Sequence, residues 1–315
     1  MPPDTNLDRA IYDLLSHQCP AMWLGFPIGA GNVFWVDGIN GLDTNVGTRP
    51  DLPFLTITHA LGECVADHND YIIVLEHGAA GVEPAYPVPI NIARVHLMGL
   101  GRRGPDQVIR IHGDGFTCFD VTGRDVEITG LGFDTVAAAA GGISASTDVF
   151  GGWVHHCHFA GSSLGQGLLY GIGRPGDQLP WWLIEDNIFS SPNGVGITDS
   201  SLLNNLVCTW IRRNIFTAPA GGAAPCILSG GVEHGAITDN YFYCPIIDAG
   251  IVGWAITLGG APFGGGPITN NHAMQTGDGT GNNPYRDTTI GAIGAKGNGW
   301  GMNYSGQAVI TPAAA

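Results

Sequence analysis

The sequence predicts an all-β chain that folds as a parallel β-helix, a solenoid whose coils stack short strands into parallel sheets. One observation is a recurring phrase, Ile-x-x-Asn-x-aromatic, at residues 184–189, 211–216 and 237–242, with a variant at 268–273. Another is the spacing, since these copies begin 26 to 31 residues apart. A fixed phrase at a nearly constant period indicates a stacked repeat architecture with one copy in each coil.

The repeating unit is built from strands rather than from helix pairs. The copies are short and rich in β-branched residues, and Gly, Asn, Ser and Pro separate them. Looser copies precede them at residues 128–133 and 154–159. A second line of predicted strands lies in the gaps between copies, at residues 119–122, 142–144, 194–198, 226–229 and 255–258. Two or three short strands in a coil of this length make a parallel β-helix.

The asparagine of the phrase predicts an internal ladder. In each coil the Ile and the aromatic residue point inward, and the Asn occupies the bend between them. Its side-chain amide can then bond the Asn of the next coil, about 4.8 Å away. Asparagine is also common in turns for local reasons, but its recurrence at one repeat position favours a ladder. The predicted rungs are Asn187, Asn214, Asn240 and Asn271.

Composition favours one elongated domain, with the β-helix over residues 33–275. The 50 glycines, 12% charged and 44% hydrophobic residues fit many tight turns around a long apolar interior. A net charge of -15 argues against nucleic acid or an anionic membrane as a partner. The longest apolar stretch, residues 246–263, is broken by Asp248 and by glycines, so no membrane span is predicted.

The two ends of the chain differ from the repeats. Residues 1–32 are predicted to form an N-terminal arm or cap, with a short amphipathic helix that Asn6 caps, and they show no signal peptide. Residues 276–315 form an irregular tail rich in Gly, Asn and Ala, which cannot build a core of its own. The tail therefore lies along the solenoid or pairs with a neighbouring subunit. The seven cysteines lack CxxC spacing, and most are interpreted as buried packing residues.

The first predicted coil carries two motifs: Gly-x-Asp-x-Asn-x-Gly-Thr at residues 41–48 and Pro-Phe-x-Thr-Ile-x-x-Ala-Leu at residues 53–61. Thr56 is expected to cap a short helix that closes the open end of the solenoid. Its predicted apolar face consists of Ile57, Ala60, Leu61, Cys64 and Val65.

Asp37 and Asp43 flank the loop before this helix. Their carboxylates could hold calcium together with backbone carbonyls. The alternative is that both carboxylates cap turns. No other cofactor is predicted.

These motifs resemble the opening of right-handed parallel β-helix proteins of the pectate lyase-like superfamily, and the resemblance extends over residues 33–275. That superfamily includes phage tail spikes and other virion proteins, as well as lyases, hydrolases, isomerases and inert scaffolds. The resemblance implies a right-handed coil. For function it implies a non-enzymatic virion structural protein, a bacteriophage spike or capsid decoration protein, assembled as a homotrimer.

Such a protein would contact other virion proteins through its N-terminal arm or C-terminal tail. A fold typical of exported proteins, without an export signal, suits assembly in the host cytoplasm and release by lysis. An extracellular location is the alternative.

The outward positions of the phrase predict two columns along the solenoid. One column contains His155, Glu185, Arg212 and Thr238, and the other contains His156, Asp186, Arg213 and Asp239. Neighbouring coils would place opposite charges about 4.8 Å apart. Trp153 and Trp210 precede the Ile position, so they face outward two coils apart.

Two interpretations of this face stay open. As a structural surface, it is an ion ladder whose tryptophans are covered by residues 160–181 or by another subunit. As a binding surface, its tryptophans and polar side chains hold a bacterial surface glycan. The enzymatic alternative is a polysaccharide depolymerase of tail-spike type, in which Glu185, Asp186 or Asp239 would be catalytic.

A lyase requires a basic Arg or Lys. Arg212 and Arg213 lie among acids that keep them protonated, and the one lysine, Lys296, lies in the tail. His155, His156 and His158 suggest a metal, but no Cys or carboxylate triad accompanies them. No metal site is therefore predicted.

Overall fold

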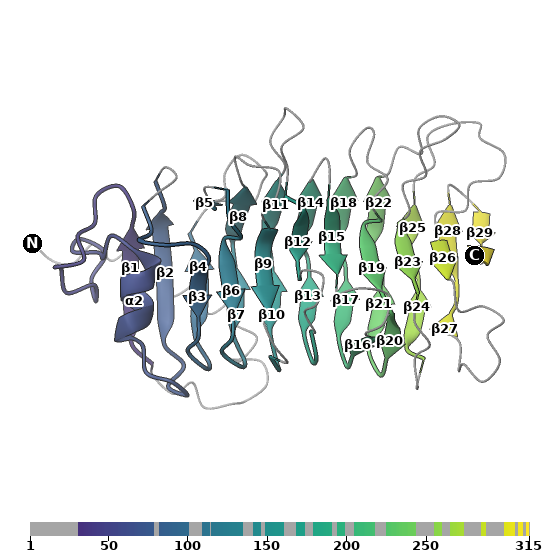
Figure 1. Cartoon of the computed structure of the whole chain (residues 1–315), viewed down its shortest axis with the longest axis horizontal. Helices are drawn as coiled ribbons and strands as arrows, with labels where there is room; N and C mark the ends of the chain where they lie inside the picture. The colour runs from purple at the N-terminus through teal and green to yellow at the C-terminus, as the bar shows by residue number, and fades with distance from the viewer. Residues whose placement is uncertain are drawn as a thin grey trace, which may run out of the picture.

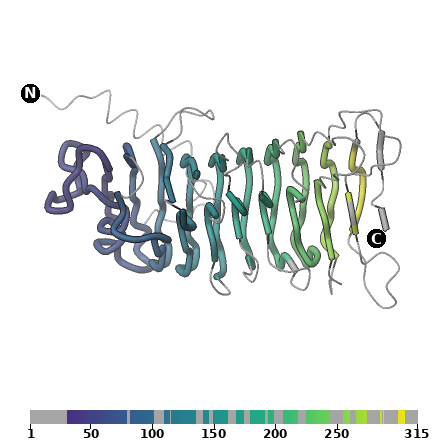
Figure 2. Tube along the Cα trace, turned by 45° about the horizontal axis from the view of Figure 1, so that its top comes forward, coloured from purple at the N-terminus to yellow at the C-terminus, as the bar shows by residue number. Residues whose placement is uncertain are grey.

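The computed structural model is an elongated solenoid in which short strands stack in rows along the long axis (Figure 1). Figure 2, turned by 45°, shows the same coils following one another at even spacing. The structure describes residues 31–78, 82–100, 109–113, 115–134, 141–145, 149–160, 168–173, 179–190, 194–198, 205–217, 225–243, 255–259, 265–273, 285–287, 299–305, 308–310 and 313–314. Outside these residues lie the predicted helix that Asn6 caps and three single residues, Cys19, Cys244 and Lys296.

The first sheet runs the length of the molecule and is parallel throughout. Its strands are β1 (Val33–Asp37), β2 (Tyr71–Glu76), β4 (His96–Gly99), β7 (Glu127–Thr129), β10 (Trp153–His155), β13 (Leu183–Glu185), β17 (Trp210–Arg212), β21 (Ala236–Thr238), β24 (Pro267–Thr269) and β27 (Gly299–Trp300).

The second sheet begins after the bend that follows the first sheet in each coil. Its strands are β5 (Ile109–His112), β8 (Leu131–Asp134), β11 (His158–Ala160), β14 (Ile188–Ser190), β18 (Ile215–Thr217), β22 (Tyr241–Tyr243), β25 (His272–Ala273), β28 (Asn303–Ser305) and β29 (Ala308–Ile310). All described pairs in this sheet are parallel except β28 with β29.

The third sheet completes each coil. Its strands are β3 (Val88–Ile90), β6 (Phe119–Val121), β9 (Gly141–Ala145), β12 (Tyr170–Ile172), β15 (Val195–Thr198), β19 (Ile227–Ser229), β23 (Ile256–Leu258), β26 (Tyr285–Asp287) and β30 (Ala313–Ala314). A fourth, two-stranded sheet pairs β16 (Asn205–Val207) with β20 (Gly231–Glu233). The prediction of a right-handed parallel β-helix is confirmed.

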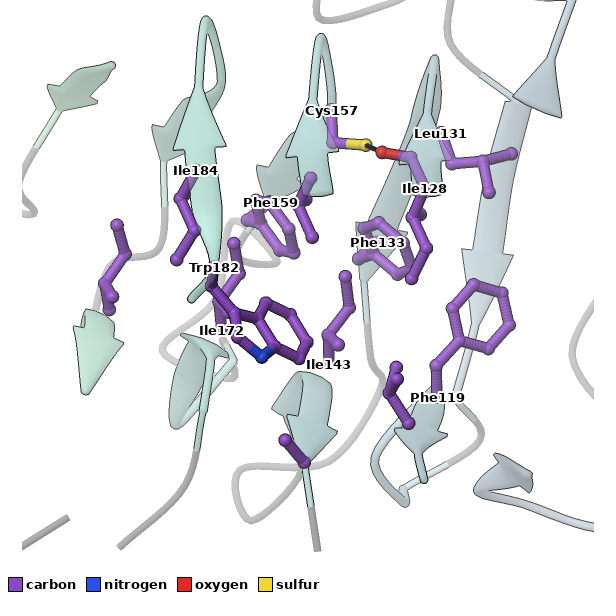
Figure 3. Packing of buried hydrophobic residues seen from close by; sticks show 14 of the residues in the cluster. Phe119, Ile128, Leu131, Phe133, Ile143, Cys157, Phe159, Ile172, Trp182 and Ile184 are labelled. Atoms are coloured by element: carbon purple, nitrogen blue, oxygen red, sulfur yellow. Dashed lines mark hydrogen bonds between the residues drawn. The ribbon is translucent and has the colours of Figure 1, made fainter. Parts of the chain in front are cut away.

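The interior consists of side chains stacked coil on coil. Rings at the aromatic position of the phrase stack nearly parallel from Phe133 to Phe242, with centroids 4.7–4.9 Å apart and interplanar angles of 7–11°. Figure 3 shows Phe133 and Phe159 in this row, beside the buried Ile128, Ile143 and Ile184. Each buried ring contributes roughly 1.5–3 kcal/mol relative to an exposed one, so regular stacking stabilises every coil.

The predicted asparagine ladder is present and buried. The Nδ2 of Asn187 donates to Oδ1 of Asn214 at 3.1 Å, and the bonds from Asn214 to Asn240 and from Asn240 to Asn271 are both 3.0 Å. The ladder also has a rung that was not predicted, because Asn271 donates to Asn303 at 2.9 Å. At its other end Cys157 takes the Asn position, and its backbone N–H donates to Oδ1 of Asn187 at 2.9 Å.

The residue before Cys157 and before each of the four predicted rungs turns the chain from the first sheet into the second. His156, Asp186, Arg213, Asp239 and Asn270 all adopt left-handed backbone conformations, with φ between 54° and 58°. This conformation is uncommon for residues with a side chain and is best tolerated by Asn and Asp.

The N-terminal cap is the helix α2 (Ile57–Glu63), which packs against β1, β2 and β3. As predicted, the Thr56 hydroxyl caps it by accepting a hydrogen bond from the His59 N–H at 3.0 Å. Ile57, Ala60, Leu61 and Cys64 are buried, but Val65 is 55% exposed. The assignment of Val65 to the apolar face was wrong because the helix ends at Glu63, so helical spacing does not apply there.

The sheets continue beyond residue 275. Strands β26, β27 and β28 pair in parallel with β23, β24 and β25, so the described part of the predicted tail adds coil structure to the solenoid. Trp300 stands opposite Ile268 in this added coil, where the phrase would place an isoleucine.

The predicted role of the cysteines is confirmed within the described residues. Cys64, Cys118, Cys157 and Cys226 are buried free thiols, and Cys208 is half-buried. Burial raises the pKa of the Cys157 thiol to about 12, so this group stays protonated in the core. Its Sγ donates to the carbonyl oxygen of Ile128 at 3.6 Å, as drawn in Figure 3.

None of the helical structure in the described residues is long and apolar enough for a membrane span.

Candidate functional site: the outer face of the first sheet

The predicted columns lie on the outer face of the first sheet, in the predicted register. His155 pairs with Glu185, Glu185 with Arg212, and Arg212 with Thr238. Trp153 and Trp210 both stand opposite Leu183, so they are two coils apart. We call the surface formed by β7, β10, β13, β17, β21 and the bends that follow them the tryptophan face.

Glu185 is the centre of the tryptophan face. Its Oε2 accepts hydrogen bonds at 2.6 Å from Nε of Arg212 and from Nη2 of Arg213. Its Oε1 accepts a bond at 3.2 Å from the indole Nε1 of Trp153. The carboxylate is also buried. Glu185 therefore joins three consecutive coils, and both of its oxygens are occupied.

Asp186 forms a two-bonded pair with Arg213 in the neighbouring bend. Nε of Arg213 lies 3.0 Å from Oδ1 of Asp186, and Nη2 lies 2.8 Å from Oδ2. Burial raises the pKa of Asp186, but the hydrogen bonds and charge of Arg213 lower it further, so the net pKa lies below its ordinary value. The bond to Asp186 in turn raises the pKa of Arg213. Neither group is suited to gain or lose a proton near neutral pH.

Asp239 is the exposed acid of the second column. It occupies the bend two coils beyond Asp186, with Arg213 in the bend between them. Coils about 4.8 Å apart would place Asp186 and Asp239 roughly 9.6 Å apart, near the upper end of the separation used by inverting glycosidases. The structure thus brings Asp186 and Asp239 to one face, and Arg213 is bound to Asp186.

A chain of histidines and a carboxylate extends the site toward the N-terminus. Buried Glu127 lies between His96 and His155, with Oε2 2.5 Å from Nδ1 of His96 and Oε1 2.9 Å from Nε2 of His155. Burial raises the pKa of Glu127, but the bonds to both imidazoles lower it to below its ordinary value. Nδ1 of His155 then meets Nδ1 of His156 at 2.7 Å.

This contact links the protonation of the two imidazole rings. If the Nε2 of His155 donates to the carboxylate of Glu127, its Nδ1 accepts the proton of His156. His155 is on the outer side of the sheet as predicted, but it is buried because the ring of Trp153 stacks on it at 4.0 Å.

Sequence reasoning missed Glu127 and His96. The signal was present, since Glu127 occupies the position before the Ile of its coil, as Trp153 does, and the two residues pair in register. His96 stands opposite Glu127 in the preceding coil.

The indole rings differ in how far they reach solvent. Trp153 is half-buried by its contacts with Glu185 and His155, whereas Trp210 is 45% exposed. Trp181, which was not predicted, is 60% exposed in the bend before β13 and has a φ of 63°. Its backbone N–H donates to the Val207 carbonyl oxygen, which fixes the bend beside the first sheet. Two exposed indoles therefore lie near the starts of neighbouring strands, Trp181 before β13 and Trp210 in β17.

A second ion ladder lies at the bends that precede the first sheet. Arg94 Nε lies 3.7 Å from Asp67 Oδ1 and 3.8 Å from Asp125 Oδ2, and Arg124 lies 3.1 Å from Asp67. Opposite charges thus alternate from coil to coil both in the bends before the first sheet and in the bends after it. Such ladders stabilise a solenoid wherever charged residues repeat, so ion pairs alone do not mark a functional site.

The remaining predicted residues lie elsewhere. His158 is buried on β11 in the second sheet, where its Nε2 meets Ser190 Oγ at 2.6 Å, so it does not join His155 and His156. Asp37 accepts from the N–H groups of Ile39 and Asn40, and Asp43 accepts from those of Leu55 and Thr56. In these contacts both carboxylates cap backbone turns, which is the alternative to calcium binding described above. Within the described ranges, no three His, Cys, Asp or Glu side chains are grouped so as to hold a metal ion.

Most of the acids on the tryptophan face are held in ion pairs or hydrogen bonds, and Asp239 is the exposed one. Glu127, Glu185 and Asp186 are each bound to arginine or histidine. A glycosidase acid must be protonated before it can donate, and arginine pairing opposes that. Exposed indoles beside fixed polar groups suit the apolar faces and hydroxyls of a sugar.

The fold and this face define the chain as a right-handed parallel β-helix with an aromatic, ion-paired outer surface. No known protein-family model matches the chain, and a search of curated proteins found none similar to it in sequence.

Proposed function

We propose that this chain is a non-enzymatic structural protein of a virion, a bacteriophage spike or capsid decoration protein, whose tryptophan face binds a bacterial surface glycan. The observation that carries the binding role is the exposed indole of Trp210, which lies on the same face as Glu185 and Asp186, two carboxylates that arginines bind. The particle assignment rests on the resemblance of residues 33–275 to the pectate lyase-like superfamily.

Glycan binding is tested with Trp210→Ala. This substitution removes the most exposed predicted platform while leaving the interior untouched, so at least a tenfold loss of affinity for bacterial surface polysaccharide is expected, equal to about 1.4 kcal/mol. Asp239→Asn is the matched control, because it changes an exposed residue of the same face without removing a ring. Equal affinity for Trp210→Ala and the parent protein would contradict the binding role.

The enzymatic alternative is a polysaccharide depolymerase that uses Asp186 and Asp239. The estimated separation of these acids, near the inverting range, supports considering it. Release of reducing ends from bacterial glycans, abolished by Asp239→Asn and by Asp186→Asn, would establish this alternative. Binding without such release supports the structural assignment.

We further propose that copies associate through the outer face of the second sheet, as a homotrimer. From β14 to β28, the described strands of this sheet contain no Asp, Glu, Lys or Arg, and they expose Ile215, Tyr241 and Tyr243. Aromatic residues are enriched and charges depleted at interface cores. An uncharged face also limits repulsion between chains of net charge -15.

Sedimentation velocity tests this assembly. A mass three times that of one chain is expected, together with dissociation in the double substitution Tyr241→Arg and Tyr243→Arg. Trp210→Arg places a charge on the first sheet and serves as the control. A monomeric mass for the unmodified protein, together with its absence from purified particles by proteomics, would contradict both assembly and the virion assignment.

A further inference from the structure

The N-terminal cap is held in a different way from the coils that follow it. Five consecutive backbone N–H groups, those of residues 55–59, donate to side-chain oxygens at the start of α2. Four of the five donate to just two carboxylates, Asp43 and Glu83. The first N–H groups of a helix have no hydrogen-bond acceptor within the helix. Asp43 and Glu83 supply the missing acceptors at the N-terminal end of α2.

Glu83 makes the more buried of the two contacts. Its Oε1 accepts from the Ile57 N–H at 2.7 Å, and its Oε2 accepts from the N–H and the hydroxyl of Thr58 at 3.0 and 2.6 Å. It is 4% exposed and reaches α2 from the segment that leads into β3. Asp43 accepts from Leu55 and from the N–H and hydroxyl of Thr56 at 2.9–3.0 Å.

His77, at the end of β2, is the titratable group that faces Glu83 within the described residues. Its Nε2 lies 3.6 Å from Oε1 of Glu83, and the ring is fully buried with no hydrogen-bond partner among the described residues. Asp70 holds the other end of the cap, accepting from the Val65 and Asn32 N–H groups and contacting Nδ1 of His68 at 2.6 Å. Three carboxylates thus clamp one short helix.

In the described coils, the ladder that connects one bend to the next contains no ionisable group. Their polar ladder consists of asparagine amides from Asn187 to Asn303, and their packing consists of stacked rings and aliphatic side chains. Amides do not titrate, so acid leaves the ladder intact. In a solenoid each coil depends on its neighbours alone, so one end can open while the remainder stays folded.

We propose that Glu83 is an acid-operated latch, which acts with the capping contacts of Asp43 to keep α2 closed over the end of the solenoid and releases the helix when the Glu83 carboxylate takes up a proton. A protonated carboxyl loses acceptor capacity and the negative charge that favours a helix start. Release uncovers Phe54, Ile57 and Leu61 together with the first coil they cover. This inference does not depend on the proposed virion role.

The direction of the pH effect follows from Glu83. Burial raises its pKa, but the interactions with His77, Thr58 and Ile57 lower it further, so the folded pKa lies below the ordinary value. A lowered pKa contributes stability that is present above the unfolded pKa, about 4.3, and is lost as pH falls through the folded pKa. The latch is therefore closed at neutral pH and opens in acid.

Hydrogen exchange of the full chain, read by peptide, tests the latch. Between pH 7 and pH 3, protection of the amides of residues 57–63 is expected to fall by up to tenfold for each pH unit below about 4.3, because opening takes up a proton. The amides of residues 195–198 in β15, a coil strand without ionisable side chains, should keep their protection. Loss of protection in both segments at the same pH would overturn the proposal, as would full protection of both.

Glu83→Gln separates the charge from the packing. The variant should lose protection at residues 57–63 at pH 7, by at least tenfold, and should show no further loss in acid from this site. Glu63→Gln changes an exposed acid on the same helix and should behave as the parent protein. If Glu83→Gln does not fold, the comparison of cap and coil amides in the parent protein still tests whether acid opens the cap alone.

Discussion

At the scale of single residues, the buried asparagines connect sequence to stability most directly. The Oδ1 of Asn214 accepts from both the backbone N–H and the Nδ2 of Asn187, and its own Nδ2 donates to the carbonyl of Ile184 and to Asn240. Each rung therefore satisfies groups in the coil before it and the coil after it. A single substitution leaves several buried polar groups without partners.

We predict that Asn214→Ala lowers the free energy of unfolding by about 2–4 kcal/mol, because each orphaned buried group costs roughly 1–3 kcal/mol. Asn303→Ala should cost less, since Asn303 is the last rung in the described residues and has one ladder partner, Asn271. Urea denaturation followed by circular dichroism measures both. Equal effects of the two changes would contradict the ladder argument.

The ion pair between Arg213 and Asp186 on the tryptophan face lowers the pKa of Asp186. Arg213→Ala should raise the pKa of Asp186 toward its ordinary value, because the hydrogen bond and the charge of Arg213 lower this pKa more than the charges of His156 and His155 do. The stability that Asp186 contributes above its unfolded pKa would then be lost at a higher pH than in the parent protein. Carboxyl carbon chemical shifts followed by NMR measure this pKa. Arg49→Ala breaks an exposed pair with Asp51 and should leave Asp186 unchanged.

At the scale of the element, the three-residue strands β18 and β22 of the second sheet each have two outward positions and one inward position. In β18 the rings of Phe189 and Phe242 cover the inward Phe216 at 4.7 and 4.8 Å, whereas its outward neighbour Ile215 is 37% exposed. Adjacent residues of one strand therefore carry very different energies. The same alternation keeps the core of the coil intact while the outer face varies.

We predict that Phe216→Ala costs roughly 3–5 kcal/mol, because it leaves a cavity between two rings that the neighbouring coils hold in place. The matched control Ile215→Ala should stay within about 0.5 kcal/mol of the parent protein. Denaturant midpoints with unchanged m-values would measure both effects. A larger loss for Ile215 than for Phe216 would mean that the strand is inverted.

At the scale of the whole molecule, the solenoid is a sum of similar coils. The chain positions of the rungs differ by 26 between Asn214 and Asn240 and by 31 between Asn240 and Asn271, yet both pairs bond at 3.0 Å. The variable length therefore lies outside the strands and the bend. A coil can then be removed as a unit.

We predict that deleting residues 237–267 gives a folded, shorter solenoid. Ala236 would connect to Ile268, Asn214 would bond to Asn271, and Arg213 would stand beside Asn270 without like-charge contact. Small-angle scattering should show a maximum dimension shorter by about 4.8 Å, one coil spacing. Deleting 15 residues, 237–251, breaks the register and is the control. A soluble, equally long product from the first deletion would contradict the repeat assignment.

Sequence periodicity alone determined the coil, its strands and four rungs of the ladder. Both the Ile and the Asn must face the interior in every coil, so their spacing records the fold. The columns of His155, Glu185 and Arg212 followed from the same register, because outward positions alternate with inward ones in any strand.

Only the tertiary structure decided which of these outward groups touch. That Glu185 binds Trp153 and two arginines, and that Glu127 joins His96 to His155, depends on side-chain directions that no period encodes. The contact between Glu83 and the start of α2 was equally hidden, because 26 residues separate the carboxylate from Ile57. Repeating contacts leave a periodic trace in a sequence, whereas a contact made once leaves none.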